Sequence, residues 1–118
     1  MIKEDLIDIL ETFCDDVYLQ GTYDEKEPYP SRLITFFITS APFDAFYDDN
    51  ANYINWYINV MFYSRDPQEV LDIPPQIVQT LKSEGYIPQG AGNDIISDDK
   101  DLTGWALEFV FQEKYINE

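Results

Sequence analysis

The residues of this chain best suited to chemistry are its carboxylates, and one group of them is spaced like the start of a calcium-binding loop. Asp99, Asp101 and Gly104 fall at the first, third and sixth positions of such a loop, where oxygen ligands and a turn-forming glycine are required. The twelfth position, which normally supplies a bidentate glutamate, is Val110. Gly104 also begins a strand pattern. We therefore interpret this segment as a solvated acidic loop and not as a metal site.

Other catalytic groups are scarce. The chain has no histidine, so a transition-metal site would need carboxylates alone. Cys14 is the only cysteine; it has no histidine to act as its base, and the two aspartates that follow it disfavour a thiolate. No serine lies in a nucleophile-elbow pattern, and the Gly-Ala-Gly run at 90–92 lacks the third glycine of a dinucleotide-binding loop. These features predict a protein that is not an enzyme and needs no cofactor.

Charge and length narrow the class of protein further. The 118 residues include 23 acidic and 7 basic side chains, a formal charge of -16, which argues against binding to nucleic acid or to anionic membranes. A single cysteine excludes an internal disulfide, and we find neither a bilayer-spanning apolar run nor a signal peptide. We expect one soluble domain over residues 1–118, made in the cytoplasm.

Apolar periodicity predicts a helix at the start of the chain. Leu6, Ile9, Leu10 and Phe13 recur at helical spacing, so a helix from Lys3 to about Asp15 would bury one stripe and contain Cys14 as an inert, partly buried residue. The apolar patch at 17–19 predicts a brief strand before a charged, proline-bounded loop at 24–30.

Three longer segments alternate as strands do. They span residues 32–39, 53–64 and 104–115, each with one continuous apolar face. The expected buried positions are Ile34, Phe36, Ile38; Ile54, Trp56, Ile58, Val60, Phe62; and Trp105, Leu107, Phe109, Phe111. Asp44 to Asn52 is interpreted as a hairpin connection, and 94–97 as one short strand.

A second helix has clear start and stop signals. Asp66, Pro67 and Glu69 supply an N-cap acceptor, a first-turn proline and a capping-box glutamate. Pro74 removes a backbone donor, so we expect a kink or two consecutive short helices before Gly85 ends the segment. The order of elements predicts an α+β fold: a single-domain, mainly antiparallel sheet with two helices on one face.

One face of the 53–64 strand is the candidate interaction site. Tyr57, Asn59, Met61 and Tyr63 point away from the predicted core, and such aromatic and methionine side chains are enriched at protein interfaces. The alternative is that a helix or the acidic loop covers this face within one subunit. We name the four residues as a candidate subunit interface.

Short segments along most of the chain resemble, in the expected order, the tail-completion or tail-terminator proteins of long-tailed bacteriophages and prophages of Gram-positive bacteria. They are Gln20-Gly21-Thr22, Pro30-Ser31, Ile34-Thr35-Phe36-Phe37, Phe46-Tyr47-Asp48-Asp49 before Trp56, Phe62-Tyr63-Ser64-Arg65-Asp66-Pro67, Leu81-Lys82, Gly85-Tyr86-Ile87, Gly90-Ala91-Gly92-Asn93-Asp94, Ser97-Asp98 and Thr103-Gly104-Trp105.

This resemblance implies a tail-terminator-like fold and a structural role in the virion tail, with assembly in the host cytoplasm. Six copies would form a ring that caps the head-proximal end of the tail tube, stops its growth and contacts the head-tail connector. The implied partners are further copies of the chain, the tail tube protein and the connector protein. A head-completion protein on the same axis would have a similar sequence pattern.

The acidic loops suggest a use for the charge in such a ring. Asp44, Asp48, Asp49, Asp98, Asp99 and Asp101 are candidate channel or loop acids, which would repel passing DNA from the channel wall. A different class of function remains open: an acidic DNA mimic that inhibits a restriction or other DNA-binding defence enzyme. The concentration of acids in loops and in the first helix favours assembly over mimicry.

Overall fold

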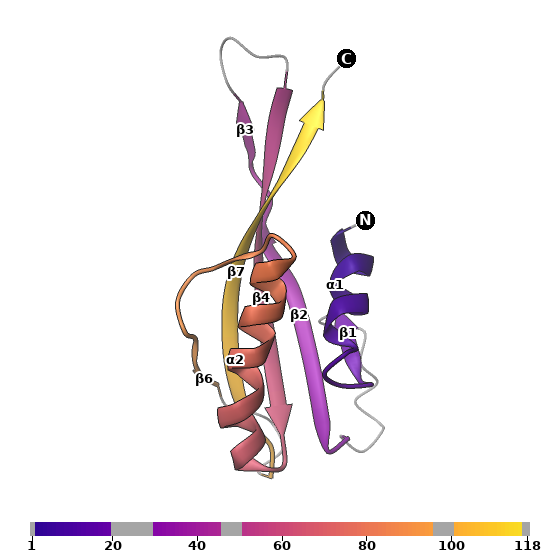
Figure 1. Ribbon diagram of the computed structural model, residues 1–118, viewed down its shortest axis with the longest axis vertical. Helices are drawn as coiled ribbons and strands as arrows, with labels where there is room; N and C mark the ends of the chain where they lie inside the picture. The colour runs from indigo at the N-terminus through magenta and orange to yellow at the C-terminus, as the bar shows by residue number, and fades with distance from the viewer. Residues whose placement is uncertain (1, 20–29, 46–50, 96–100, 117–118) are drawn as a thin grey trace.

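Seven strands form one sheet, and two helices lie on one of its faces (Figure 1). The computed structural model describes residues 2–19, 30–45, 51–95 and 101–116; for 44, 45, 51, 52, 115 and 116 it describes the backbone alone. The helices are α1 (Ile2–Leu10) and α2 (Pro67–Ser83). The strands are β1 (Val17–Leu19), β2 (Arg32–Ser40), β3 (Phe43–Ala45), β4 (Ala51–Ser64), β5 (Ile87–Pro88), β6 (Asn93–Ile95) and β7 (Thr103–Ile116).

The sheet has the order β1-β2-β4-β7-β5, with β3 also paired to β4 and β6 to β7. Only the β1–β2 pair among these is parallel. The predicted α+β class, the mainly antiparallel sheet and the brief strand at 17–19 are therefore confirmed. The short strand expected at 94–97 is β6, which begins at Asn93 and ends at Ile95.

The core lies between this sheet and the two helices. Register places Ile34 opposite Phe62, which in turn lies opposite Trp105, so the apolar positions of β2, β4 and β7 share one face. The predicted alternation is confirmed for the centre of each strand. Side chains from both helices pack on this face and complete a cluster of buried residues that includes Leu6, Leu10, Ile34, Phe36, Ile58, Val60, Phe62, Ile77, Leu81, Leu107 and Phe109.

Helix α2 begins and ends where its sequence predicts. The Gln68 amide donates to the Asp66 carboxylate at 2.9 Å, and Pro67 occupies the first turn. At the other end Gly85 has a φ of +94°, while the Tyr86 amide donates to the Leu81 carbonyl at 2.9 Å, as in a Schellman cap. The expectation of two short helices at Pro74 is wrong, because one helix runs through Pro74 and Pro75. Pro74 is buried, and the apolar area that it removes from water helps to offset the lost backbone bond.

Helix α1 is shorter than expected. It ends at Leu10 instead of about Asp15, and the chain closes with tight turns in which the Phe13 amide donates to the Leu10 carbonyl at 3.0 Å. Cys14 is therefore buried in the segment after the helix and not within it. The apolar stripe continued to Phe13 because that residue still packs against the core from the turn.

The connection between β2 and β4 contains more structure than the sequence predicts. Residues Phe43–Ala45 form strand β3, which pairs antiparallel with β4 from Ala51 onward. The chain therefore turns back between 44 and 52 as predicted, but the connection is shorter than expected because both of its ends belong to strands. Residues 46–50 lie outside the described part of the chain. Strand β5 was also not predicted. Each of these two strands is defined by its pairing with a long neighbour, and its own residues are too few to alternate.

Strands β4 and β7 are both 14 residues long and extend beyond the helices (Figure 1). We call β3, residues 51–56 and residues 111–116 the arm, and the remainder the body. The molecule measures 53 × 28 × 22 Å, and its radius of gyration is 15.7 Å. A compact chain of this length would have a radius of gyration of about 13.5 Å. The arm accounts for the elongated shape.

Candidate interaction surface

The predicted interface residues share the sheet face opposite the helices, which we call the open face. Tyr57, Asn59, Met61 and Tyr63 alternate with the buried positions of β4, so they point away from the core. Both helices lie on the other side of the sheet in Figure 1. The alternative that a helix covers this face is therefore wrong for the described helices. The middle of the acidic loop of the same alternative, residues 46–50, lies outside the described residues.

The open face is nearly uncharged in the body. Its described strand positions at 33–39, 57–63 and 104–110 include one charged residue, Glu108. Across the sheet, Met61 lies opposite Thr35 and Ala106, while Asn59 lies opposite Phe37 and Glu108. In a chain with a formal charge of -16, this is a surface on which like-charge repulsion is small.

The most exposed row of this face contains an apolar residue that the sequence analysis missed. Tyr57, Val110 and Ile87 follow one another across β4, β7 and β5. Tyr57 is 39% exposed and Ile87 is 56% exposed, which are large values for such side chains. Pairing of β5 with β7 places Ile87 here, and no periodicity in its own two-residue strand could have indicated it.

The other end of the face is packed more tightly. A Cβ added at Gly104 would lie 2.8 Å from the Tyr63 ring and 2.7 Å from the Ile95 side chain, so the glycine makes room for both. Met61 and Asn59 are half-buried between these two ends. Polar groups fix the backbone and rim: Thr39 Oγ1 donates to the Tyr57 carbonyl at 3.1 Å, and Gln112 Nε2 donates to Asn55 Oδ1 at 3.0 Å.

The two candidate channel acids within the described residues lie far apart. Asp44 lies in β3 opposite Tyr53, while Asp101 precedes β7 at the end of the sheet where Thr103 pairs with Ser64. At about 3.3 Å per residue along β4, these ends are roughly 36 Å apart. The Asp101 carboxylate lies 3.7 Å from the Arg65 guanidinium. Asp48, Asp49, Asp98 and Asp99 lie outside the described residues.

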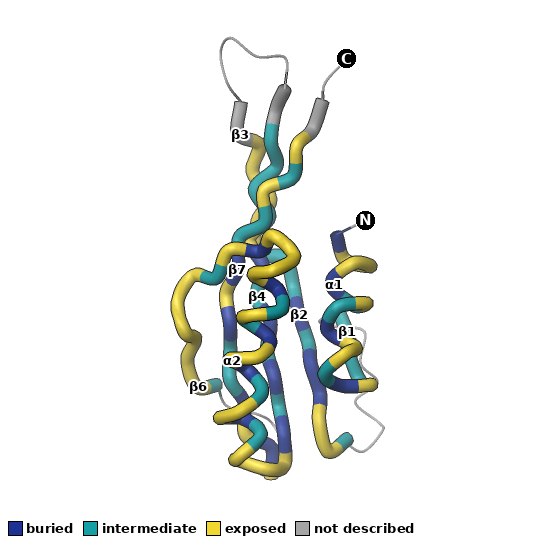
Figure 2. Tube along the Cα trace, viewed as in Figure 1, coloured by how far each residue is buried: buried dark blue, intermediate teal, exposed yellow. Residues whose placement is uncertain are grey.

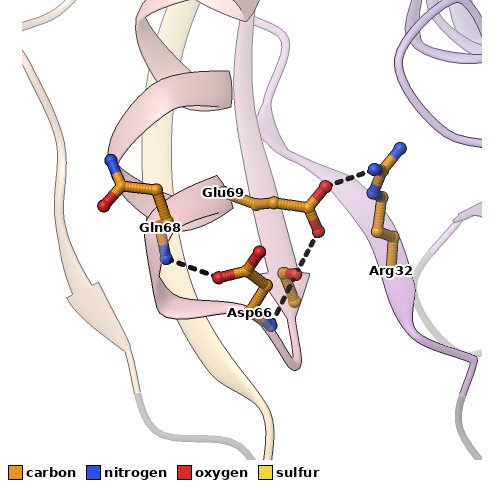
Figure 3. Close-up of polar contacts among 5 residues, drawn as sticks. Arg32, Asp66, Gln68 and Glu69 are labelled. Carbon is orange, nitrogen blue, oxygen red and sulfur yellow. Dashed lines mark hydrogen bonds and ion pairs between the residues drawn. The ribbon is translucent and has the colours of Figure 1, made fainter.

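A polar cluster that joins α2 to the sheet was not predicted (Figure 3). The buried Ser64 hydroxyl accepts from the Asp66 amide at 3.0 Å and donates to Glu69 Oε1 at 2.7 Å. The other Glu69 oxygen pairs with the Arg32 guanidinium of β2. Glu69 was expected to reach back to the Asp66 amide as in a capping box, but Ser64 lies between them. The capping pattern in the sequence predicted the helix start. The contact with Arg32 could not be predicted, because Arg32 is distant from Glu69 in the sequence.

This cluster shifts the protonation equilibria of its charged members. The Arg32 contact, and then the Ser64 hydrogen bond, lower the pKa of the Glu69 carboxyl, and the same contact raises the pKa of Arg32. Its geometry holds a helix start in place. The Ser64 hydroxyl lies beside the Glu69 carboxylate, but Ser64 is fully buried and out of reach of a substrate, and the carboxylate is also paired with Arg32. We assign the cluster a structural role.

Two further groups have pKa values shifted by burial. Burial, partly offset by a hydrogen bond to the Asp16 carbonyl, raises the pKa of the Cys14 thiol, which makes it a poorer nucleophile. Burial also raises the pKa of Tyr86 to about 12. Within the described ranges, no group of three or more possible ligands could hold a metal ion, and neither helix has the length and apolarity needed to cross a bilayer.

Comparison with known protein families gives no family model that matches this chain, and comparison with curated proteins gives no match. The open face, the arm and the ordered sequence segments therefore carry the functional inference.

Proposed function

We propose that this protein is a structural component of a bacteriophage tail that caps the head-proximal end of the tail tube. In this role it ends tube growth as a ring, most simply of six copies, and contacts the head-tail connector. It acts in the virion tail after assembly in the host cytoplasm. The proposed partners are sister copies, the tail tube protein and the connector protein.

The observation that best supports this proposal is the open face. Tyr57 and Ile87 are exposed in one row, Met61 is half-buried further along the same face, and Glu108 is the single charged residue among the described strand positions of the open face in the body. Large apolar side chains on a flat and nearly uncharged surface are typical of protein interfaces. The same lack of charge does not favour the DNA-mimic alternative, which requires carboxylates spaced like phosphates.

The edges of the arm support a ring for a second reason. Beyond Val110, none of the described strands pairs with the outer side of β7, and β3 is paired on its β4 side. The outer edge of a strand can act as a template for pairing with another chain. Because the two edges of the arm differ, joining one to the other would be a head-to-tail contact, the type that closes into rings.

In a ring, the acidic residues at the two ends of the long strands would lie at the two rims and could repel DNA. Asp44 and Asp101 lie at opposite ends of the long strands. Carboxylates at both rims would repel the phosphates of exiting DNA and let it slide. Retention of DNA by the assembled ring at low salt would contradict this part of the proposal.

Tail tubes grown from purified tube protein provide the test. With the wild-type protein present, we expect negative-stain images to show density at one tube end and tubes that stop lengthening. Tyr57→Glu combined with Ile87→Glu should abolish this effect, since buried unpaired carboxylates oppose the contact. Gln76→Glu, at an exposed position of α2 on the helix side of the sheet, is the matched control and should behave as wild type. Tubes that lengthen equally with and without the protein would refute the proposal.

A further inference from the structure

A second apolar surface lies on the helix side of the molecule. It is a groove of about 550 Å³ between α2 and the segment that leads through β6, with β7 at its base. Helix α2 contributes Leu71, Pro74, Pro75 and Val78, and the far side contributes Trp105 and Asp94. Leu71 is 69% exposed, although leucine is usually among the more buried residue types. The volume lies in the range of sites that bind small ligands or a few side chains.

The walls of this groove are held in place by short contacts. Trp105 Nε1 donates to the Ala91 carbonyl at 2.8 Å, so the indole hydrogen bond is used and its ring is available as an apolar surface. Gly92 has a φ of +104°, and a Cβ there would collide with Trp105 and with the Ala106 carbonyl. The segment can approach β7 this closely only because residue 92 is glycine. The groove is therefore built into the fold.

Asp94 is the one charged residue among the described residues that line the groove, and Gln79 and Thr103 are neutral polar residues of the same lining. Pro74 and Pro75 have no N–H to donate to the carbonyls of Val70 and Leu71, which leaves acceptor capacity on the helix. None of the described lining residues is lysine or arginine. This environment favours apolar groups accompanied by positive charge.

We propose that the groove binds an apolar segment flanked by lysine or arginine residues, supplied by a protein other than this chain. A second copy is a poor occupant, because each copy has a formal charge of -16 and the open face is the less charged surface for self-association. The groove and the open face lie on opposite sides of the sheet. The inference therefore does not depend on the proposed tail function, and the two can fail separately.

Synthetic peptides are the probes for this site. One peptide has a leucine- and phenylalanine-rich centre with lysines on both sides; the second has the same centre flanked by glutamates; the third has lysines around a serine-rich centre. Binding is followed by fluorescence of Trp105 in a Trp56→Phe background and by amide chemical shifts. We expect the lysine-flanked apolar peptide to bind at least ~10-fold more tightly than either other peptide at low salt, with a smaller difference from the glutamate peptide as salt rises.

Variants locate the binding site. Leu71→Gln should weaken binding by about 10-fold, the equivalent of losing most of one buried apolar side chain. Asp94→Asn should reduce the preference for lysine flanks. Ile87→Gln, on the open face, is the matched control and should bind as wild type. Since Leu71 and Asp94 are exposed, both variants should fold, which circular dichroism checks.

Several results would overturn the proposal. They are equal affinity for lysine- and glutamate-flanked peptides, absence of binding, or chemical-shift changes confined to the open face. A second copy as the occupant is also an outcome of the experiment: sedimentation would then show self-association that Leu71→Gln reduces and Ile87→Gln does not.

Discussion

The body and the arm of this protein share the same alternating strand pattern, but the apolar face of the pattern is buried only in the body. In the body, Ile58, Val60 and Phe62 of β4 are at most 1% exposed because the helices pack over them. In the arm, Ile54 continues the same alternation but is only half-buried. Figure 2 shows buried residues along the strands beside the helices and none among the described residues of the arm. Alternation therefore defines which face is apolar, and a covering layer decides whether that face becomes core.

This difference also suggests what the arm is for. Trp56 and Phe111 begin the arm, and Phe111 stacks on Tyr86 with ring centroids 4.6 Å apart. Beyond this point the three strands contain apolar side chains without a helix to cover them. Phe43 of β3 is 69% exposed. Apolar side chains that stay exposed to water contribute little hydrophobic stabilisation to the arm. Contact with another molecule would bury this surface, as the proposed ring requires.

The largest difference in stability between the body and the arm is expected when an apolar side chain is removed from each region. Phe36→Ala in the body should lower the free energy of unfolding by about 3–5 kcal/mol, because Phe36 is fully buried. Ile54→Ala in the arm should cost about 1 kcal/mol or less, since its side chain is only half-buried. Urea denaturation measures both. Equal losses would mean that the arm contributes to the core as the body does.

A smaller loss is expected at the polar cluster, which lies at the end of the body farthest from the arm. Ser64→Ala should destabilise the protein by about 1–2 kcal/mol, because the Asp66 amide and the Glu69 carboxylate each lose a partly buried hydrogen bond. Ser40→Ala, at an exposed position at the end of β2 nearest the arm, is the control and should change stability by about 0.5 kcal/mol or less. A loss at Ser64 no greater than at Ser40 would show that the cluster is dispensable.

Much of the body was predictable because its signals are local. Alternation identified the three long strands and their buried faces, and Asp66 with Pro67 identified the start of α2. The extra strands β3 and β5 were not predictable, because each exists through pairing with a longer strand. The continuity of α2 at Pro74 depends on tertiary burial, which outweighed the local preference for a break.

The interaction surfaces, too, could be predicted from the sequence only in part. Alternation placed Tyr57, Asn59, Met61 and Tyr63 on one face, but only the fold brings Ile87 into the same row. The contact between Arg32 and Glu69 joins residues 37 positions apart, and the groove requires β6 to lie beside α2. Such distant neighbours leave no periodic signal in one sequence.

The polar cluster should also make the stability of the body depend on pH. The folded-state pKa of Glu69 is below its ordinary 4.5, so the ionised carboxyl favours folding above that pH. This contribution should disappear as the pH falls from about 4.5 through the lowered folded pKa. The difference in unfolding free energy between wild type and Glu69→Gln should therefore shrink over this range, as measured by urea denaturation. A constant difference from pH 7 to pH 3 would contradict the assigned pKa direction.

The smallest expected effect compares two tryptophans with different hydrogen bonding, one at the base of the arm and one in the body. Trp105→Phe removes the bond from Nε1 to the Ala91 carbonyl and should cost about 1 kcal/mol more than Trp56→Phe. Trp56 Nε1 is buried and has no hydrogen-bond partner among the described residues. Replacing Trp56 by phenylalanine removes this unpaired donor, and the gain offsets part of the stability lost with the larger ring. Urea denaturation of the two variants, which share one chemical change, measures the difference. A larger loss of stability for Trp56→Phe would contradict the prediction, and would mean that the Trp56 ring at the base of the arm contributes at least as much stability as Trp105 in the body.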